Sequence, residues 1–409
     1  MRFESFIASR IIRSKPYKNT ISAPIIKISI LSITIGFLMM IISISSGVGL
    51  QKTIQNKISS FFGHISVSNF QNNSSQSSLT PILINQEFYT NNKIEEINHI
   101  QTVAYKSGVI TTKSTFEGVV FKGINEDFNW TVFSEYIIEG QMPSINNKIT
   151  NEVIISDYLS IRLNLKLGEK FKTSFLKMDS SIPNERNFKV VGIFNSGLIE
   201  FDQIYFLGDI KHIQKMNKWN SNQIGNFEIF IKNFNDISKT SDKLYAITPS
   251  NLDVINISDK FSDIFNWIAL FDMNILLIIV IMILVGGINM ITALLVTILE
   301  KIQLIGILRV LGSNINSIRY IFLSNGLYLI SIGLLFGNII GLGLIFFQKF
   351  TGFIKLNPET YYVTEVPVDI NLVTIIILNF GILFFCLLML IIPSYIIGRI
   401  SPTQSLKIN

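Results

Sequence analysis

Hydrophobic positions along this 409-residue chain fall into four long runs that contain no charged side chain, at residues 28–51, 273–299, 320–348 and 370–398. Each run is long enough to cross a hydrocarbon layer of about 30 Å as a helix rising ~1.5 Å per residue. Helix is the expected form because backbone amides inside lipid must be hydrogen-bonded within their own segment. The pattern predicts a membrane protein with four transmembrane α-helices.

Polar sequence of ordinary composition separates the first apolar run from the second. Short alternating or β-branched runs predict strands there, and two stretches, 151–165 and 210–218, predict helices. The predicted strands are 64–70, 103–111, 116–124, 170–175, 188–194, 203–206 and 227–232. These elements indicate a large α+β domain between the first and second spans, so the order of spans is one plus three.

Lysine and arginine near the ends of the apolar runs predict the orientation in the membrane. Residues 1–27 hold six basic side chains and one acid, whereas the short loop 349–369 holds two basic side chains and three acids. Basic short segments stay on the cytoplasmic side. Both termini and the loop after the second span are therefore expected in the cytoplasm, and the α+β domain is expected on the outer side of the membrane.

The resulting organisation divides the chain into nine segments. They are a cytoplasmic amphipathic helix at 1–24, the first span at 25–51, the external α+β domain at 52–268, the second span at 269–299, a cytoplasmic helix at 300–318, the third span at 319–348, an external loop at 349–369, the fourth span at 370–398 and a cytoplasmic tail at 399–409. Residues 269–409 form the C-terminal membrane region.

Composition narrows the possible functions. The net charge of +6 belongs mainly to the inner membrane surface, where anionic lipid attracts basic segments, so it is no sign of nucleic-acid binding. The one cysteine, Cys386, falls in the last span, and the three histidines show no metal-ligand spacing. No P-loop, H-E-x-x-H or G-x-S-x-G motif occurs. We expect no cofactor and no catalytic site on this chain.

The spans carry packing signals instead. Gly333, Gly337 and Gly341 recur every fourth residue in the third span. Small residues at this spacing let helix backbones approach closely in lipid, where apolar attraction between helices is weak. They predict either packing within this chain, or a dimer interface or lipid-lined cavity.

The cytoplasmic segment 300–312 reads Glu-Lys-Ile-Gln-Leu-Ile-Gly-Ile-Leu-Arg-Val-Leu-Gly. Its apolar positions, continued through Ile315 and Ile318, predict one amphipathic helix that presents a side to another protein. Together with the order of spans, this segment resembles permeases of the FtsX/MacB type, the four-helix membrane subunits of type VII ABC transporters. Leu304 departs from that family, in which many members have Glu.

Further matches point to the lipoprotein-releasing LolC/LolE branch. They are the amphipathic leader, Gly63-His64-Ile65, residues 121–124, 138–140 and 191–194 with Ser196-Gly197, Asp202 with Tyr205, Tyr361 to Val366-Pro367, and Ser401-Pro402 with Leu406. The resemblance covers essentially the whole chain. It implies a bacterial inner-membrane protein in which residues 52–268 form a periplasmic MacB-like core domain and residues 269–409 form an FtsX-like permease domain.

The resemblance implies a set of partners and sites. A cytoplasmic LolD-like ABC ATPase would bind ATP and contact the coupling helix through Glu300, Lys301, Ile305, Gly306, Arg309 and Gly312. A second permease copy or paralogue, a lipoprotein substrate, membrane lipids and a LolA-like periplasmic carrier would complete the system. Acyl chains would lie in a cavity between the first two spans, near Gly36, Met40, Ser43, Gly286, Gly287 and Asn289, unless these residues only pack helices.

Two other functions remain open at this stage. The first is a MacB-like or FtsX-like permease that drives export of another periplasmic substrate or activates a cell-wall hydrolase. The second is a membrane-anchored binding protein that works without an ATPase. Retention of triacylated lipoproteins after depletion favours extraction over the first, and normal function after Gly306→Pro favours the second.

Overall fold

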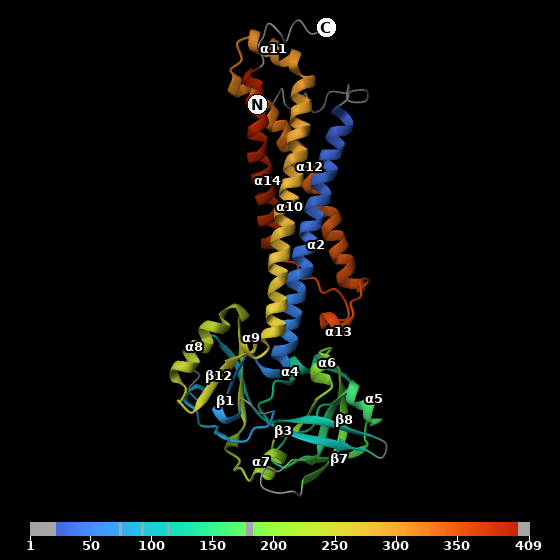
Figure 1. Ribbon diagram of the computed structural model, residues 1–409, viewed down its shortest axis with the longest axis vertical. Coiled ribbons are helices and arrows are strands. Elements are labelled where there is room, and N and C mark those ends of the chain that lie inside the picture. The colour runs from blue at the N-terminus through green and yellow to red at the C-terminus, as the bar shows by residue number, and fades with distance from the viewer. Residues whose placement is uncertain (1–21, 73–75, 91–93, 113–114, 177–182, 400–409) are drawn as a thin grey trace. The chain divides into compact units, whose positions relative to one another are not determined.

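A computed structural model describes residues 22–72, 76–90, 94–112, 115–176 and 183–399 (Figure 1). The chain forms two compact units. The helical unit comprises Met1–Gln51, Ile268–Lys355 and Val366–Asn409, and the sheet unit comprises Lys52–Trp267 and Leu356–Glu365. The predicted amphipathic leader at 1–24 and the cytoplasmic tail at 399–409 lie almost entirely outside the described residues.

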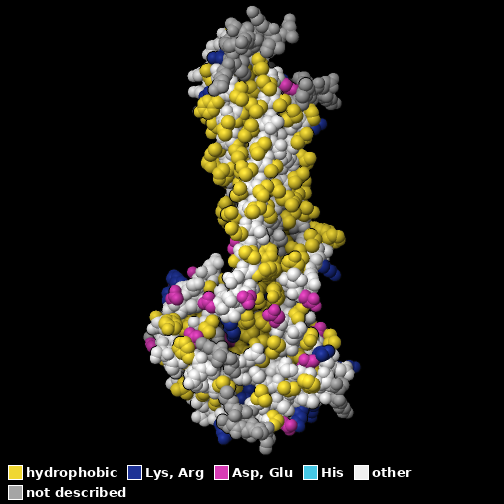
Figure 2. Space-filling model, in the orientation of Figure 1, with side chains coloured by type: hydrophobic (Ala, Val, Ile, Leu, Met, Phe, Trp, Pro, Cys, Tyr) yellow, Lys and Arg dark blue, Asp and Glu magenta, His cyan; other side chains and the backbone are white. Residues whose placement is uncertain are grey.

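Four helices of the described chain are long and apolar enough to cross a membrane, as the sequence predicts. They belong to α2 (Ser22–Phe62), α10 (Ser262–Glu300), α12 (Ile315–Thr351) and α14 (Leu372–Ser394), followed by η5 (Tyr395–Arg399), while α11 (Ile302–Val310) joins α10 to α12. Figure 2 shows hydrophobic side chains over the visible face of these spans. The helices α2 and α10 each continue without a break into residues of the sheet unit.

Apolar side chains from all four long helices meet in the core of the helical unit. Phe37, Met290, Phe322 and Leu390 are members of this buried cluster. Polar pairs add directional contacts between the helices. Asn338 and Asn379 donate to each other's side-chain oxygens at 2.8 and 3.2 Å, and such amide bonds between helices are typical of membrane bundles.

The sheet unit mixes strands with short helices. Its strands are β1 (Ile65–Asn69), β2 (Ile82–Leu83), β3 (Ile97–Thr111), β4 (Phe116–Ile124), β5 (Ile137–Gly140), β6 (Glu152–Ser156), β7 (Lys170–Phe175), β8 (Asn184–Phe194), β9 (Tyr205–Asp209), β10 (Gln223–Ile224), β11 (Asn226–Ile231) and β12 (Leu252–Asn256). Its helices are η2 (Phe70–Asn72), α3 (Glu87–Thr90), α4 (Trp130–Phe133), η3 (Ser134–Tyr136), α5 (Asp157–Leu163), α6 (Ile199–Asp202), α7 (Lys211–Asn217), η4 (Phe234–Asp236), α8 (Ile237–Ile247), α9 (Ile257–Lys260) and α13 (Pro358–Tyr361).

Ten strands form one sheet in the order β12-β1-β11-β3-β4-β9-β6-β8-β5, and β7 pairs with both β3 and β8. The pairings among β3, β4, β9, β6, β8 and β7 therefore close into a ring, and β11, β1 and β12 extend the sheet from β3. Phenylalanines from four strands of the ring meet inside it. The ring of Phe121 lies 4.9 to 6.0 Å from those of Phe206, Phe188 and Phe175.

The helix predicted at residues 151–165 is partly wrong. Residues 151–165 were expected to be helical, but β6 occupies Glu152–Ser156 and only α5 (Asp157–Leu163) is helix. Val153, Ile154 and Ile155 are fully buried within the sheet. The three residues are all apolar because both faces of this strand are buried, and their pattern does not reflect helical spacing. Ser156 ends the strand and accepts the N–H of Leu159 as the helix N-cap.

His64 follows α2 after one residue, Gly63, and stays neutral in the fold. Its Nδ1 accepts the N–H of Ile231 at 3.1 Å, and burial lowers the pKa of the imidazole to about 4. The unfolded imidazole takes up a proton near pH 6.5, so stability falls as the pH drops from that value toward 4.

Between pH 7 and pH 4.5, we expect the wild type to lose about 2 kcal/mol more stability than His64→Gln, whose amide oxygen can accept the same N–H. All three tryptophans, Trp130, Trp219 and Trp267, belong to the sheet unit, so their fluorescence reports its unfolding in the intact chain. Equal pH dependence in the two proteins would contradict this assignment.

Candidate functional site

The helix α11 presents an apolar patch on the surface of the helical unit. Ile307, Val310 and Leu311, at and just beyond its C-terminal end, are 47, 64 and 76 % exposed, whereas Ile305 and Leu308 are buried in the apolar core. We call Ile307, Val310 and Leu311 the α11 patch. Exposed apolar side chains grouped on one helix are a feature of protein-binding surfaces.

The turn after α11 is built by glycine. Gly312 has a φ of +86°, its N–H donates to Arg309 O at 3.1 Å, and the Ser313 N–H donates to Leu308 O at 2.9 Å. This is the Schellman arrangement, which satisfies the last carbonyls of a helix. Asn314 then caps α12 by accepting the N–H of Asn316 at 3.3 Å.

The structure separates the six predicted coupling residues. Glu300 ends α10, and Lys301 is the single residue between α10 and α11. Ile305 and Gly306 face the core, whereas Arg309 is partly exposed and Gly312 is exposed at the turn. Ile315 and Ile318 belong to α12, so the helix predicted at 300–318 is two helices with a turn between them.

Sequence reasoning missed the α11 patch because it selected residues by family resemblance and treated the apolar stripe as one helix. The signal lay in the sequence. Once Gly312 is taken as the C-terminal glycine of a helix, Ile307, Val310 and Leu311 fall on the side opposite Ile305 and Leu308.

The residues predicted to line a lipid cavity pack mostly against other helices of this chain. Met40 is buried in the core, and a Cβ at Gly36 would lie 3.8 Å from Met282 of α10. The Asn289 amide donates to Ser32 Oγ at 2.6 Å, which joins α10 to α2. Ser43 is partly exposed.

The two glycines of α10 differ from each other. A Cβ at Gly287 would lie 1.8 Å from Met389 Sδ, so this glycine allows close contact with α14. A Cβ at Gly286 would meet no atom within 4 Å among the described residues.

The glycines of α12 face α2 within the same chain. A Cβ at Gly333 would lie 2.7 Å from Ile33, one at Gly337 would lie 2.9 Å from Phe37, and one at Gly341 would lie 3.6 Å from Ile41. Thr34 Oγ1 of α2 also donates to Gly333 O at 3.2 Å. The spacing therefore builds a helix contact inside this chain.

A buried ion pair holds the C-terminal end of α2 in the sheet unit. The Lys122 ammonium of β4 donates to both carboxylate oxygens of Glu228 of β11, at 2.8 and 2.9 Å, and to the carbonyl of Phe61. The Lys122 and Glu228 side chains are 0 and 1 % exposed. A positive charge at the last free carbonyls of a helix also opposes the negative end of the helix dipole.

Further hydrogen bonds surround this pair. Gln101 Nε2 donates to Glu228 at 2.6 Å, and the Tyr105 hydroxyl donates to the same carboxylate. Burial lowers the pKa of Lys122, while the negative charge of Glu228 opposes that shift. Burial and the same carboxylate raise the pKa of Tyr105 well above its usual value. The tyrosine therefore remains a donor at neutral pH.

Aromatic rings enclose the same helix end. Phe61 lies 5.4 to 6.0 Å, between ring centroids, from Phe133, Phe194, Phe201 and Tyr205. Gly63 then turns the chain with a φ of +70°, and its N–H donates to Ser59 O at 2.7 Å. The end of α2 is thus held by apolar packing, a glycine cap and a buried cation together.

Lys122 and Glu228 were not singled out as site residues from the sequence. Each is one charged residue in an otherwise apolar run, Val-Val-Phe-Lys-Gly-Ile within β4 and Phe-Glu-Ile-Phe-Ile within β11. A lone charge at such a position is rarely buried unless it is paired, which was the available signal. Among the described residues, no group of three His, Cys, Asp or Glu side chains is placed to hold a metal ion.

Comparison with known proteins gives matches over most of the chain. Residues 28–246 match the MacB-like periplasmic core domain, and residues 276–402 match the FtsX-like permease C-terminal family. A curated relative, "Lipoprotein-releasing system transmembrane protein LolC" of Buchnera aphidicola subsp. Schizaphis graminum (strain Sg), is 25 % identical over 96 % of each chain. A relative of the same name from B. aphidicola subsp. Acyrthosiphon pisum (strain APS) is 23 % identical over 92 % of this chain and 91 % of its own.

Among solved structures, the periplasmic region of MacB from Actinobacillus actinomycetemcomitans is 14 % identical to this chain. It covers 49 % of this chain and 92 % of its own, with a TM-score of 0.33.

The two family matches and the curated relatives confirm the predicted family. Together with the four apolar helices and the sheet, they confirm the fold class, an inner-membrane protein with a large α+β periplasmic domain. The MacB-like match alone spans more than half of the chain. Proteins of this family are membrane subunits of ABC transporters and work with an ATPase on a separate subunit and with a permease partner. The chain belongs to the ABC transporter permeases that combine a MacB-like periplasmic core domain with an FtsX-like permease region.

Proposed function

We propose that this permease extracts lipoproteins from the outer leaflet of the inner membrane and releases them toward a LolA-like periplasmic carrier. The observation that carries the proposal is the alignment, over nearly the whole chain, with two relatives named as lipoprotein-releasing proteins. A LolD-like cytoplasmic ATPase binds ATP, and a second permease copy or paralogue completes the membrane part.

Extraction of a lipidated protein needs an energy source. Each CH₂ that leaves the lipid costs about 0.8 kcal/mol, so withdrawal of several acyl chains costs tens of kcal/mol. This chain has no P-loop, so the energy comes from the partner ATPase. The chain itself acts as a mechanical link between the ATPase and the substrate.

The structure supports such a link at two places. The α11 patch is a surface on which the ATPase can dock, because its apolar side chains have no partner within the described part of the chain that buries them. The helix α2 is continuous over 41 residues, about 60 Å at ~1.5 Å per residue, and its end is fixed by Lys122 and Glu228. A continuous helix held at its end can transmit displacement along its length.

Acyl chains have a candidate surface on α10. Gly286 has free space where a Cβ would stand, and Leu284, Val285 and Ile288 around it are 46, 45 and 60 % exposed. We propose that lipid chains lie against this side of α10. Gly36, Met40, Gly287 and Asn289 support the neighbouring helices instead of lining this surface.

Reconstitution tests the function directly. The purified permease and its co-purifying ATPase are placed in liposomes with a fluorescent triacylated lipoprotein, and the soluble carrier is added outside. We expect transfer of the lipoprotein to the carrier that depends on ATP and on the acyl chains, with a non-acylated form of the same protein as control.

Two other results would replace this proposal. Transfer that needs no acyl chains favours a MacB-like or FtsX-like permease for another substrate. Transfer or binding that needs no ATPase at all favours a membrane-anchored binding protein.

A further inference from the structure

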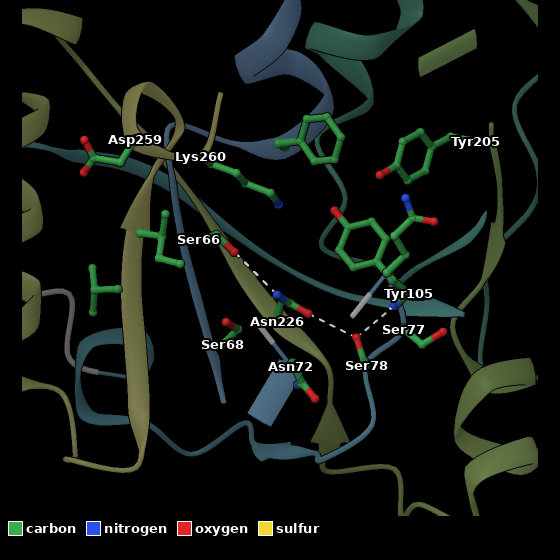
Figure 3. A pocket seen from close by; sticks show the side chains of 14 residues that line it. Ser66, Ser68, Asn72, Ser77, Ser78, Tyr105, Tyr205, Asn226, Asp259 and Lys260 are labelled. Carbon is green, nitrogen blue, oxygen red and sulfur yellow. Dashed lines mark hydrogen bonds between the residues drawn. The ribbon is translucent and has the colours of Figure 1, made fainter. Parts of the chain in front are cut away.

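The sheet unit contains a cavity of about 680 Å³ that the proposed function leaves without a role. Its volume falls within the range of about 300–1,000 Å³ that is usual for ligand sites. Side chains of the sheet and the ends of two helices line it, among them Ser66, Tyr105, Tyr205, Asn226, Phe62 of α2 and Lys260 of α9 (Figure 3).

Hydrogen bonds hold one wall of the cavity in place. Asn226 Nδ2 donates to Ser66 Oγ at 3.5 Å, and Asn226 Oδ1 accepts from Ser78 Oγ at 3.1 Å (Figure 3). Ser78 Oγ in turn accepts the N–H of Tyr105 at 3.0 Å. The amide and hydroxyl groups therefore have fixed orientations before a ligand binds, which lowers the entropic cost of binding.

Lys260 brings a positive charge into this cavity. Its ammonium lies 4.8 Å from the centroid of the Phe62 ring, and no carboxylate of the described residues lies within the ion-pair distance of 4.0 Å. The neighbouring Asp259 accepts from Asn256 Nδ2 at 2.7 Å, and its carboxylate points away from Lys260 (Figure 3). Burial lowers the pKa of Lys260, and the negative charge of Glu228 opposes that shift. Both carboxylate oxygens of Glu228 accept from Lys122, so the Lys260 ammonium is left for a ligand.

Tyr205 supplies a second donor near the same ring. Its ring centroid lies 5.5 Å from that of Phe62, and its hydroxyl has no hydrogen-bond partner among the residues that the structure describes. Burial and the negative charge of Glu228 raise the pKa of Tyr205 to about 12, so the hydroxyl keeps its proton. An ammonium and a hydroxyl donor beside one aromatic ring suit an anion.

We propose that this cavity binds an acidic polypeptide segment. One carboxylate of the segment accepts from Lys260 and Tyr205, and the backbone amides of the segment pair with the serine and asparagine side chains of the wall. The lining carries one ammonium, that of Lys260, and one carboxylate, that of Asp259, which accepts from Asn256 and points away from Lys260 (Figure 3). The other lining groups are neutral, so the Lys260 ammonium matches the single charge of a ligand carboxylate. No arginine of the described residues lines the cavity, whereas the arginine fork is the common partner of phosphate.

The cavity lies beside the ends of two long helices, so a bound ligand affects the permease. Phe62 is the last residue of α2, and Lys260 lies two residues before α10 begins. A ligand that contacts both side chains restrains the ends of two long helices. The effect of a bound ligand on the two helices rests on the proposed function, whereas ligand binding in the cavity does not.

Protection of an introduced thiol measures binding in the full-length chain. Val254 of β12 lines the cavity, and the variant Val254→Cys is labelled with iodoacetamide in detergent. If Val254→Cys does not fold, Ser68→Cys, at another lining position, takes its place. The wild type gives the background from the buried Cys386. Tyr245→Cys, exposed on α8 and outside the cavity lining, is the matched control.

The probe is the peptide acetyl-Ser-Glu-Ser-Gly-amide, and its comparison is the same peptide with Gln in place of Glu. At a probe concentration of about four times its Kd, labelling of Val254→Cys should slow about fivefold, and that of Tyr245→Cys should not change. Lys260→Gln should weaken the protection about tenfold, and Lys260→Arg should restore it. Equal protection by the Gln peptide or by inorganic phosphate, or no protection, overturns the proposal.

A second readout separates this proposal from the proposed function. In the complex with the ATPase, the Glu peptide should change the ATPase rate in the wild type and not in Lys260→Gln. Protection without any effect on the ATPase leaves the binding site established and removes the step that couples it to the helices.

Discussion

Lys122→Met is expected to destabilise the sheet unit by about 3–5 kcal/mol, the range found when one partner of a buried ion pair is removed. The substitution leaves the Glu228 carboxylate buried without a cation, and it removes the donor to the Phe61 carbonyl at the end of α2. For a unit of this size, such a loss lowers the melting temperature by about 10 °C.

Tryptophan fluorescence of the intact chain measures this change, since all three tryptophans lie in the sheet unit. Lys172→Met is the matched control. It breaks a 2.6 Å ion pair with Glu185 in which both side chains are 51 % exposed, and exposed pairs contribute only about 0–1 kcal/mol.

The double variant Lys122→Met/Glu228→Gln distinguishes an unpaired charge from a general loss of packing. It removes both charges and retains an acceptor for Tyr105 and Gln101. We expect it to recover about 2 kcal/mol relative to Lys122→Met, because no charge is left unpaired in the interior. A double variant that is no more stable than the single one would show that the ion pair is not what fixes the end of α2.

Length and hydropathy were enough to predict the four spans, because hydrocarbon admits few alternatives to an uninterrupted helix. Length and hydropathy do not predict where each helix ends. The turn at Gly312 depends on one residue with a positive φ inside an apolar pattern that continues through Ile315 and Ile318. A single glycine therefore separates two helices that hydrophobic periodicity would join.

The closed ring of strands could not be predicted from local sequence. It depends on β7 pairing with both β3 and β8, and the pairing with β3 joins residues more than 60 positions apart. The segment 151–165 shows the same limit, since only the sheet makes its first half a strand. Lys122 and Glu228 are also distant in sequence, so their pairing appears only in the fold.

Family resemblance predicts the coupling site in the segment 300–312 but does not separate buried from exposed residues within α11. Ile305 and Gly306 match the family pattern, yet both face the core. The exposed apolar side chains of this segment are Ile307, Val310 and Leu311. Resemblance points to the helix, and the packing of that helix decides which of its sides is exposed.

Val310 is exposed on α11 and Ile305 is buried, so substitutions at the two positions should act differently. Val310→Asp places a charge in the α11 patch, where the partner ATPase would have to desolvate it, so ATPase affinity should fall by about 2 kcal/mol or more, roughly 30-fold. Ile307→Asp should act in the same direction. Val310→Ala removes apolar area without adding charge and should have a smaller effect. Co-purification and titration of the ATPase onto the permease measure all three.

The stability of the sheet unit serves as the internal control, because the α11 patch lies in the helical unit. Tryptophan fluorescence should give the same melting temperature for Val310→Asp and the wild type, while stimulation of the ATPase by the permease is lost. Ile305→Asp should behave differently, since it buries a charge in the core of the helical unit and lowers the yield of folded protein. If the ATPase binds Val310→Asp and Ile307→Asp as tightly as the wild type, the α11 patch is not its docking surface.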